Sequence, residues 1–218
     1  GSEMCIRDSV TSASNVTGAI PPLKEIKELL PEKVLFVCDG AQGAGHIPID
    51  IKRTGIDALA IAGHKGMMGI QGSGALLFSE RINPRPVMFG GTGSESISLD
   101  MPDFYPDALE AGTLAFPAIS SLLEGAGYLS GRGESIGKEL LSMTEYFLDG
   151  LKKLSSFRAY SVPNPCGIAA FGHRDVQSEF LAQELSESYS VAVRGGLHCA
   201  PLMHRALKTE EDGLVRVS

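Results

Sequence analysis

Short apolar runs that end in polar or charged residues constrain the fold of this chain more than any other feature. The runs are VLFVCDG (34–40), DALAIAGHK (57–65) and GALLFS (74–79). Continuous apolar runs of this length are typical of buried parallel strands. Helical or looping connections separate them, which favours an α/β layer fold whose ligands bind outside the carboxyl ends of the strands. Four polar side chains fall there: Asp39, Gln42, His64 and Lys65.

Each of these four residues also has an ordinary explanation. Asp39 could cap a helix, His64 could be a partly buried histidine with satisfied partners, and Lys65 could extend into water from a turn. The other explanation for Lys65 is a site that needs an uncharged amine, because burying an ammonium group is costly. Single residues therefore do not decide between these alternatives.

The rest of the chain divides into a larger and a smaller part. The segment 21–33 has apolar residues at helical spacing, 80–118 is rich in Gly, Pro and Ser, and 117–153 is helical with a break at SGRGES. From about residue 154, strand and helix patterns alternate. We expect a large domain over 10–153 and a small α/β domain over 154–218.

The two ends of the chain do not continue the pattern. GSEMCIRDS (1–9) lacks the apolar core of a signal peptide, and GLVRVS (213–218) reads as a strand that is still running. We expect residues 1–9, with Cys5, to be a non-native leader, and the chain to be a fragment truncated at both ends.

Composition excludes several classes of function. A net charge of −7 argues against a nucleic-acid or acidic-membrane partner, and no apolar run approaches the ~20 residues of a membrane span. The cysteines have no CxxC spacing, which argues against a disulfide framework or a metal site and fits a reducing cytoplasm. Cys38 and Cys166 lie in apolar runs and are expected to be structural.

A series of motifs carries a more specific signal. They are SNVTG, CDGAQGAGHIPIDI, DALAIAGHKGMMGIQGSGALLF, GGTGS, LEAGTLAFPAI, VAVRGGLHCAPLMH and GLVRVS, and they span everything after residue 9. Together they resemble the class V aminotransferase family of pyridoxal-phosphate enzymes, and within it most closely the cysteine desulfurases of the NifS and SufS type. The resemblance implies the α/β pyridoxal-phosphate-dependent transferase fold (fold type I): a partial large domain with a mainly parallel sheet, and a small C-terminal domain.

The resemblance assigns roles around pyridoxal 5'-phosphate. Lys65 matches the lysine that forms a Schiff base with the cofactor, for which its amine must be uncharged. Asp39 matches the aspartate that pairs with the pyridine nitrogen, so that the ring acts as an electron sink. Gln42 matches the residue that binds the phenolic oxygen, and His64 matches a phosphate ligand. Thr113 matches a residue that reaches the cofactor of the other subunit, which implies a homodimer.

It also assigns roles toward the substrate. Asn15 matches an asparagine near the cofactor ring and the substrate carboxylate, and Arg216 matches the arginine that clamps that carboxylate. Cys199 matches the nucleophile that takes sulfur from L-cysteine as a persulfide and releases alanine. Arg194, a further substrate-binding candidate, and His198 could favour its thiolate. The short loop before Cys199 implies a sulfur-accepting partner protein, as in cytoplasmic iron–sulfur cluster assembly.

The chain also departs from the family pattern. Ala62, Ala108 and Ala115 stand where the family often has polar residues, and most of the amino-terminal half of the large domain is missing. We expect exposed sheet edges and a weakly folded, nearly inactive chain. Two alternatives stay open: a selenocysteine lyase or other class V enzyme, and an inactive sulfur carrier or scaffold. His46 and Asp50 are expected to be structural.

Overall fold

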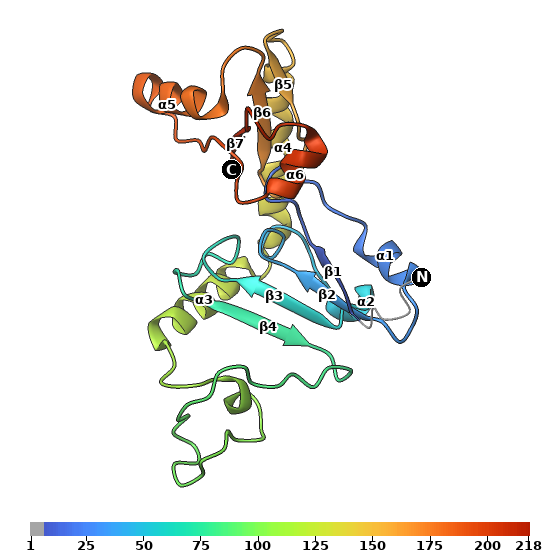
Figure 1. The fold of residues 1–218 in the computed structure, drawn as a ribbon, viewed down its shortest axis with the longest axis vertical. Helices are drawn as coiled ribbons and strands as arrows, with labels where there is room; N and C mark the ends of the chain where they lie inside the picture. Colours follow the sequence, from blue (N-terminus) through green and yellow to red (C-terminus); the bar gives the residue numbers. More distant parts are fainter. Residues whose placement is uncertain (1–6) are drawn as a thin grey trace.

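Two sheets organise the chain, one below the other in Figure 1. The computed structural model describes residues 7–218, so the expected leader up to residue 6, with Cys5, lies outside the described residues. The larger sheet has the order β1-β2-β3-β4. Its strands are β1 (Arg7–Thr11), β2 (Leu35–Asp39), β3 (Ala58–Ala62) and β4 (Gly74–Phe78).

The first strand starts inside the expected leader. Arg7 to Ser9 pair in parallel with residues 35–37 of β2. The pairing does not bear on whether these residues are native, so the leader stays a prediction.

The sheet is mainly parallel, as expected, but the third apolar run differs from the prediction of a buried strand. β1, β2 and β3 run parallel, whereas β4 pairs antiparallel with β3. The connection over 63–73 is too short for a parallel crossover, which needs a dozen or more residues. β4 forms one edge of the sheet and is exposed along most of its length. Leu76 and Leu77 therefore face solvent.

Two short helices pack against the core of this sheet, α1 through Leu23 and Ile26 and α2 through Ile51. α1 (Leu23–Leu29) follows the expected helix, and α2 (Ile51–Thr54) begins at Asp50, whose Oδ1 accepts from the N–H groups of residues 52 and 53 at 3.0 Å. A side-chain cap of this kind is the structural role expected for Asp50. The buried cluster comprises Leu23, Phe36, Cys38, Ile56 and Leu59.

The middle of the chain follows the predicted pattern. Residues 80–115 form an extended excursion, green in Figure 1, whose regular structure is the short helix η1 (Asp107–Leu109). Two long helices follow, α3 (Phe116–Leu129) and α4 (Gly133–Leu151). They are separated at residues 130–132, where SGRGES predicts a break.

The smaller sheet is antiparallel, in the order β5-β6-β7. VAVRGG (191–196) belongs to the region where strand and helix patterns alternate, but it forms no strand; it makes a single bridge, between Arg194 and Arg216. The elements of this part are β5 (Phe157–Ala159), β6 (Ala169–His173), α5 (Ser178–Tyr189), α6 (Pro201–Leu207) and β7 (Val215–Val217).

Residues 12–18, which follow β1, join the two sheets. Ala13 packs against Cys166 and Ile168, and Val16 packs against Ala170 and Leu214 of the smaller sheet. We call residues 12–18 the joint segment. Because both apolar side chains are fully buried, the larger sheet is held to the smaller one through this segment.

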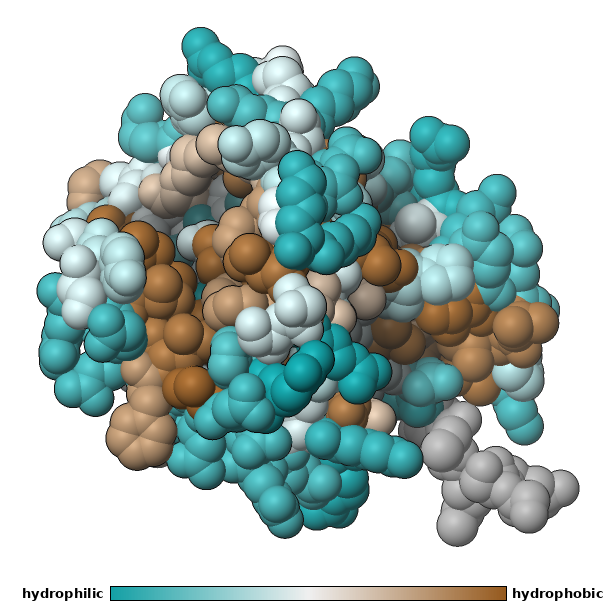
Figure 2. Space-filling view, turned by 90° about the horizontal axis from the view of Figure 1, so that it is seen from above, coloured by the Kyte–Doolittle hydropathy of each residue, from teal (hydrophilic) through white to brown (hydrophobic). Residues whose placement is uncertain are grey.

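Much apolar surface remains exposed. Figure 2, which views the molecule from above, shows apolar patches between hydrophilic rims. Exposed apolar side chains include Phe180 of α5 and Leu202 of α6. Further ones lie within residues 80–115 and on α3. No helix among residues 7–218 combines the length and the apolar character needed to cross a membrane.

Candidate functional site

The parallel register brings the ends of the first three strands together. Thr11 pairs with Asp39 and Asp39 with Ala60. The N–H of Gly40 then donates to the carbonyl of Ala60 at 2.8 Å. Asp39 is exposed, and one of its carboxylate oxygens accepts from the N–H of Ala41 at 2.9 Å. The Asp39 carboxylate is thus oriented by its own loop at the carboxyl edge of the sheet.

The loops after β2 and β3 touch backbone to backbone. Gly45 has φ +89°, and a Cβ there would collide with the carbonyl of Gly66; a Cβ on Gly66 would collide with the carbonyl of Ala44. Glycine is required at both positions because no side chain fits between the loops. Gln42 and the turn with His64 and Lys65 therefore lie on neighbouring loops.

Lys65 is exposed on a turn, and its role as the amine that binds the cofactor stays a prediction. Both Lys65 and His64 are exposed, and the turn closes through the N–H of Met68, which donates to the carbonyl of Lys65 at 2.9 Å. His46 is partly buried behind the turn, close to Gly66, and burial lowers the pKa of its ring. Its position agrees with the structural role expected for it.

Helix α3 supports the lysine turn from behind. The N–H of Ile70 donates to Ser121 Oγ at 3.0 Å, and a Cβ on Gly125 would collide with the carbonyl of Met67. Thr113 is exposed just before this helix. Its approach to the cofactor of a second subunit stays a prediction.

A second group of predicted residues gathers around Cys199. The thiol is exposed and lies 3.5 Å from Nη2 of Arg194. Arg194 and Arg216 exchange two backbone hydrogen bonds of 3.1 and 2.8 Å, and Nη1 of Arg216 donates to the carbonyl of Asn15 at 2.9 Å. Asn15 Nδ2 in turn donates to the carbonyl of His198 at 2.8 Å. Residues more than 170 positions apart in the sequence thus form one cluster.

The charges in this cluster are unevenly solvated. Burial lowers the pKa of Arg216, and the neighbouring Arg194 charge lowers it further, while Cys199 acts in the opposite direction. Nε of Arg216 is buried without a hydrogen-bond partner among the described residues. A guanidinium with a free donor suits a carboxylate ligand.

The two buried cysteines differ from Cys199. Burial raises the pKa of Cys38 and of Cys166 to about 11, which fits structural thiols.

His198 does not contribute a charge to Cys199, contrary to the expectation from sequence. Its side chain is turned into the core, where the residue is 2% exposed and Nε2 lies 2.9 Å from the carbonyl of Leu214. Burial lowers the pKa of the ring to about 4, so the imidazole is neutral near pH 7. The hydrogen bond to the Cys199 thiol comes from Arg194, whose Nη2 lies 3.5 Å from the sulfur.

The joint segment links the two groups. The N–H of Ser12 donates to the carbonyl of Asp39 at 2.8 Å, and Ser12 Oγ accepts from the N–H of Gly43 at 3.1 Å. Asn15, three residues after Ser12 in the same segment, bonds to His198 in the second group. Sequence reasoning missed Ser12, since a serine after a strand carries no motif.

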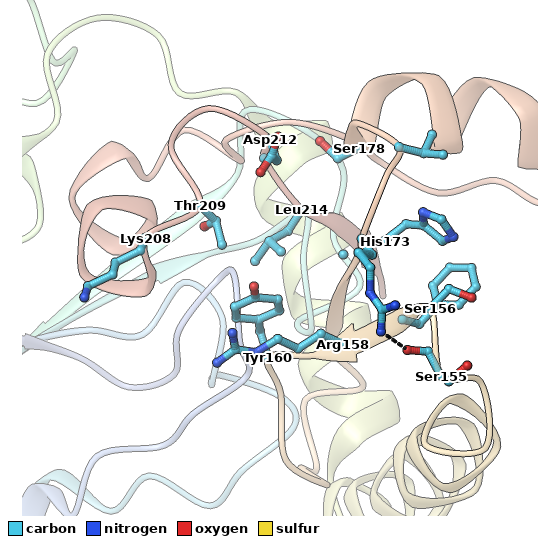
Figure 3. A pocket seen from close by; sticks show the side chains of 15 residues that line it. Ser155, Ser156, Arg158, Tyr160, His173, Ser178, Lys208, Thr209, Asp212 and Leu214 are labelled. Atoms are coloured by element: carbon cyan, nitrogen blue, oxygen red, sulfur yellow. Dashed lines mark hydrogen bonds between the residues drawn. The ribbon is translucent and has the colours of Figure 1, made fainter.

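A cavity of about 330 Å³ beside the smaller sheet contains none of the predicted site residues. Figure 3 shows Arg158, Lys208 and Asp212 around it, with Leu214 and Tyr160 between them. The charged groups do not point at one another there, and Lys208 extends away from the rest. The cavity therefore offers no convergent set of ligand-binding groups.

Comparison with known proteins decides the family. The family model described as aminotransferase class-V matches residues 8–218. The chain belongs to the aminotransferase class-V family. Enzymes of this family generally use pyridoxal phosphate.

Relatives within the aminotransferase class-V family carry more specific names. The chain is 32% identical over 219 aligned residues to a probable cysteine desulfurase of Methanothermobacter thermautotrophicus, covering 96% of this chain and 54% of the relative. The structure of an apo cysteine desulfurase from Thermococcus onnurineus NA1 matches with a TM-score of 0.81 and 30% identity, over 97% of this chain and 54% of that one. The cysteine desulfurase CsdA (S-sulfonic acid) from Escherichia coli matches with a TM-score of 0.82 and 28% identity, over 97% and 53%. The chain thus spans about half the length of the relatives that it matches.

Proposed function

We propose that this chain carries the active-site residues of a pyridoxal-phosphate-dependent cysteine desulfurase, which converts L-cysteine to L-alanine and transfers the sulfur to Cys199. The observation that supports this most is the position of the Cys199 thiol. It is exposed, it lies 3.5 Å from a guanidinium nitrogen of Arg194, and it is tied through Asn15 to the strand ends that carry Asp39. An exposed thiol beside a cation is the environment of a reactive cysteine.

The donors at the strand ends fit the cofactor chemically. Lys65 offers an exposed amine for an aldehyde, Asp39 an oriented carboxylate for a pyridine nitrogen, and His64 an exposed imidazole for a phosphate. Gln42 would bind the phenolic oxygen, and Thr113 would reach the cofactor of a second copy. When bound, pyridoxal phosphate supplies an electron sink that weakens the bonds around the α-carbon of the substrate.

The chain's own residues would then bind the substrate and receive its sulfur. Arg216, with Arg194 and Asn15, would hold the substrate carboxylate through donors such as the free Nε of Arg216. The Cys199 thiolate attacks the sulfur of L-cysteine. A sulfur–sulfur bond forms and the carbon–sulfur bond breaks. The electron pair of the broken bond stays with the carbon, which takes up a proton equivalent to the one that the Cys199 thiol gave up. The thiol and cysteine thus become a persulfide and alanine, with no outside oxidant.

The proposal extends to partners and compartment. The active form would be a homodimer in the cytoplasm, and the persulfide would pass to a sulfur-acceptor protein, as in iron–sulfur cluster assembly. Arg194 to Cys199 form a short segment, which leaves the thiol accessible to such an acceptor.

Alanine release by the protein in its full natural length tests this function. L-cysteine and pyridoxal phosphate are supplied, and Cys199→Ala is compared with the natural protein. We expect alanine formation to be lost in the variant, while borohydride still fixes the cofactor to Lys65. Unchanged turnover in Cys199→Ala would favour a class V enzyme that uses no thiol. Alanine formed from selenocysteine alone would indicate a selenocysteine lyase.

An inactive sulfur carrier or scaffold is the second candidate. It is favoured by Ala62, at the end of β3, and by Ala108 and Ala115, since each lacks a polar group common in the family. Failure of borohydride to fix any cofactor to Lys65 would support this alternative against the enzyme.

A further inference from the structure

The backbone around Cys199 has an unusual conformation. His198 has φ 52° and Cys199 has φ 58°, so two successive residues other than glycine lie in the left-handed region. Side-chain-bearing residues rarely adopt this conformation, and it persists only where neighbouring contacts determine it. Something must therefore hold this pair of residues in place.

Two hydrogen bonds hold His198, one at its backbone carbonyl and one at its ring. Its carbonyl accepts from Asn15 Nδ2 at 2.8 Å, and its ring Nε2 lies 2.9 Å from the carbonyl of Leu214. A backbone hydrogen bond also joins this segment to the chain before β7, because the N–H of Leu214 donates to the carbonyl of Gly196 at 3.1 Å. One bond comes from the joint segment and the other from the residue before β7.

The ring is suited to act as a neutral donor. Nδ1 is buried without a partner among the described residues, so the proton of the neutral ring is assigned to Nε2, which donates to Leu214. Arg216, His204 and Arg194 all disfavour a charge on the ring, in addition to its burial. The bond to Leu214 is therefore maintained by an uncharged imidazole near pH 7.

The same contacts reach the groups that the reaction uses. Asn15 accepts through its carbonyl from Arg216 Nη1 at 2.9 Å, and Arg216 pairs with Arg194, which lies beside the Cys199 thiol. Hydrogen bonds thus link Asn15 to His198, His198 to Leu214 and Arg216 to Asn15, and the chain from Leu214 to Arg216 completes the circuit. His198, the buried member of this group, is followed directly by the exposed Cys199.

We propose that His198 and Asn15 are positioning residues that hold the Cys199 loop in its left-handed conformation and so keep the thiol beside Arg194 for sulfur transfer. Neither role requires His198 to touch the substrate. The expected change in kcat rests on the proposed function. The expected change in the alkylation rate of Cys199 does not depend on that function.

Alkylation of Cys199 by iodoacetamide tests the position of the thiol without cofactor or turnover. A Cys5→Ser background leaves Cys199 as the exposed cysteine among the described residues. We expect His198→Leu to slow alkylation at pH 7 several-fold, because a released loop no longer holds the exposed thiol in its position 3.5 Å from the Arg194 guanidinium. His198→Gln retains a side-chain donor and should restore the rate.

His204→Leu is the matched control. His204 is fully buried, and its ring centroid lies 5.7 Å from that of His198, but its Nδ1 pairs with Thr209 instead of the cysteine loop. Its loss should reduce stability and leave the alkylation rate unchanged. Equal alkylation in His198→Leu and the parent, or equal slowing in His204→Leu, would overturn the proposal.

Two further measurements complete the test. If His198→Leu does not fold, Asn15→Leu removes the other bond at a partly buried position and should slow alkylation in the same way. In the full-length holoenzyme, His198→Leu should lower kcat by about 100-fold with KM for L-cysteine little changed, as expected for a displaced nucleophile. A change confined to KM would contradict positioning. Absence of all desulfurase activity in the parent would refute the proposed function and leave the alkylation result to judge the positioning role.

Discussion

Lys65 and Cys199 owe their exposure to the backbone around them. Lys65 stands on a turn packed against the next loop through Gly45 and Gly66, and Cys199 stands on a loop held from below by His198. In both cases neighbouring residues are fixed while the reactive group faces outward. This arrangement suits groups that must meet a cofactor or a substrate.

Ala62 provides the first prediction at this scale. A hydroxyl at the end of β3 would add a hydrogen bond to the cofactor phosphate, and bonds to charged groups are worth about 1.5–3 kcal/mol. Ala62→Ser should therefore tighten binding of pyridoxal phosphate by about tenfold in an absorbance titration. Ala60→Ser, on the same strand two residues earlier, is the control and should have no effect. Equal tightening in both variants would count against a phosphate site at Ala62.

The second prediction concerns His198 and pH. Burial lowers the pKa of this ring from 6.5 to about 4, so the unfolded chain takes up a proton as the pH falls through 6.5 and the folded chain does not. The stabilising contribution is complete above pH 6.5 and is lost as the pH falls to 4, by about 3 kcal/mol in free energy of unfolding.

Urea unfolding at pH 7 and at pH 4 measures this loss, with His198→Gln for comparison. The variant should lose about 3 kcal/mol less stability between the two pH values than the parent. Burial lowers the pKa of His46 too, but this contribution is common to both proteins. Identical losses would show that His198 is protonated equally in the folded and unfolded chains.

Sequence reasoning located these residues but not the contacts between them. Asn15, Arg194, Cys199 and Arg216 were selected through the family resemblance, and the structure brings them together. The orientation of His198 could not be predicted, because the acceptor of its ring is the carbonyl of Leu214, distant in sequence.

At the scale of elements, a buried carboxylate fastens the amino-terminal ends of β2 and β3 to the chain after β4. Asp57 is 2% exposed; it accepts from the N–H of Phe36 at 2.8 Å, from Ser79 Oγ at 3.1 Å and from Arg81 Nη1 at 3.0 Å. Phe36 lies on β2, whereas Ser79 and Arg81 both lie on the chain after β4. The carboxylate therefore sets how these segments meet at the end of the sheet opposite Asp39.

Asp57→Ala should lower the free energy of unfolding by about 3 kcal/mol, because it leaves Nη1 of Arg81 and the Phe36 N–H without their acceptor. Asp50→Ala also removes one carboxylate, but it loses only an exposed helix cap, worth about 1 kcal/mol. Urea denaturation of the two variants makes the comparison. A smaller effect at Asp57 than at Asp50 would contradict this account of the network.

The predicted elements were correct where the pattern is local. Apolar periodicity and runs predicted α1, β2 and β3, and SGRGES predicted the break between α3 and α4. The direction and exposure of β4 and the single bridge of VAVRGG depend on which segments lie alongside them. Local sequence does not contain that information.

For the whole molecule, the joint segment and the exposed apolar surface matter most. Residues 12–18 hold the smaller sheet, beside which Cys199 lies, to the larger sheet that carries Lys65. Phe116 and Leu123 are exposed on α3, the helix that follows Thr113. A second copy that covers this face would bring Thr113 to the other subunit, as the proposed homodimer requires.

Self-association tests the role of this face. Phe116→Asp should weaken dimerisation by about tenfold or more in sedimentation velocity, since burying a phenylalanine contributes about 1.5–3 kcal/mol. Leu202→Asp on α6 is the control, because Leu202 is 73% exposed and Phe116 76% exposed. Equal weakening by the two substitutions would indicate unspecific apolar association.

The destination of the substrate sulfur tests the central claim most directly. The full-length protein with pyridoxal phosphate is given L-cysteine labelled with a heavy sulfur isotope, and its cysteine peptides are alkylated and analysed by mass spectrometry. We predict a labelled persulfide on Cys199 and none on the buried Cys38 or Cys166. Alanine formed without label on Cys199, or label on one of the other two cysteines, would contradict the assignment of Cys199 as the sulfur acceptor.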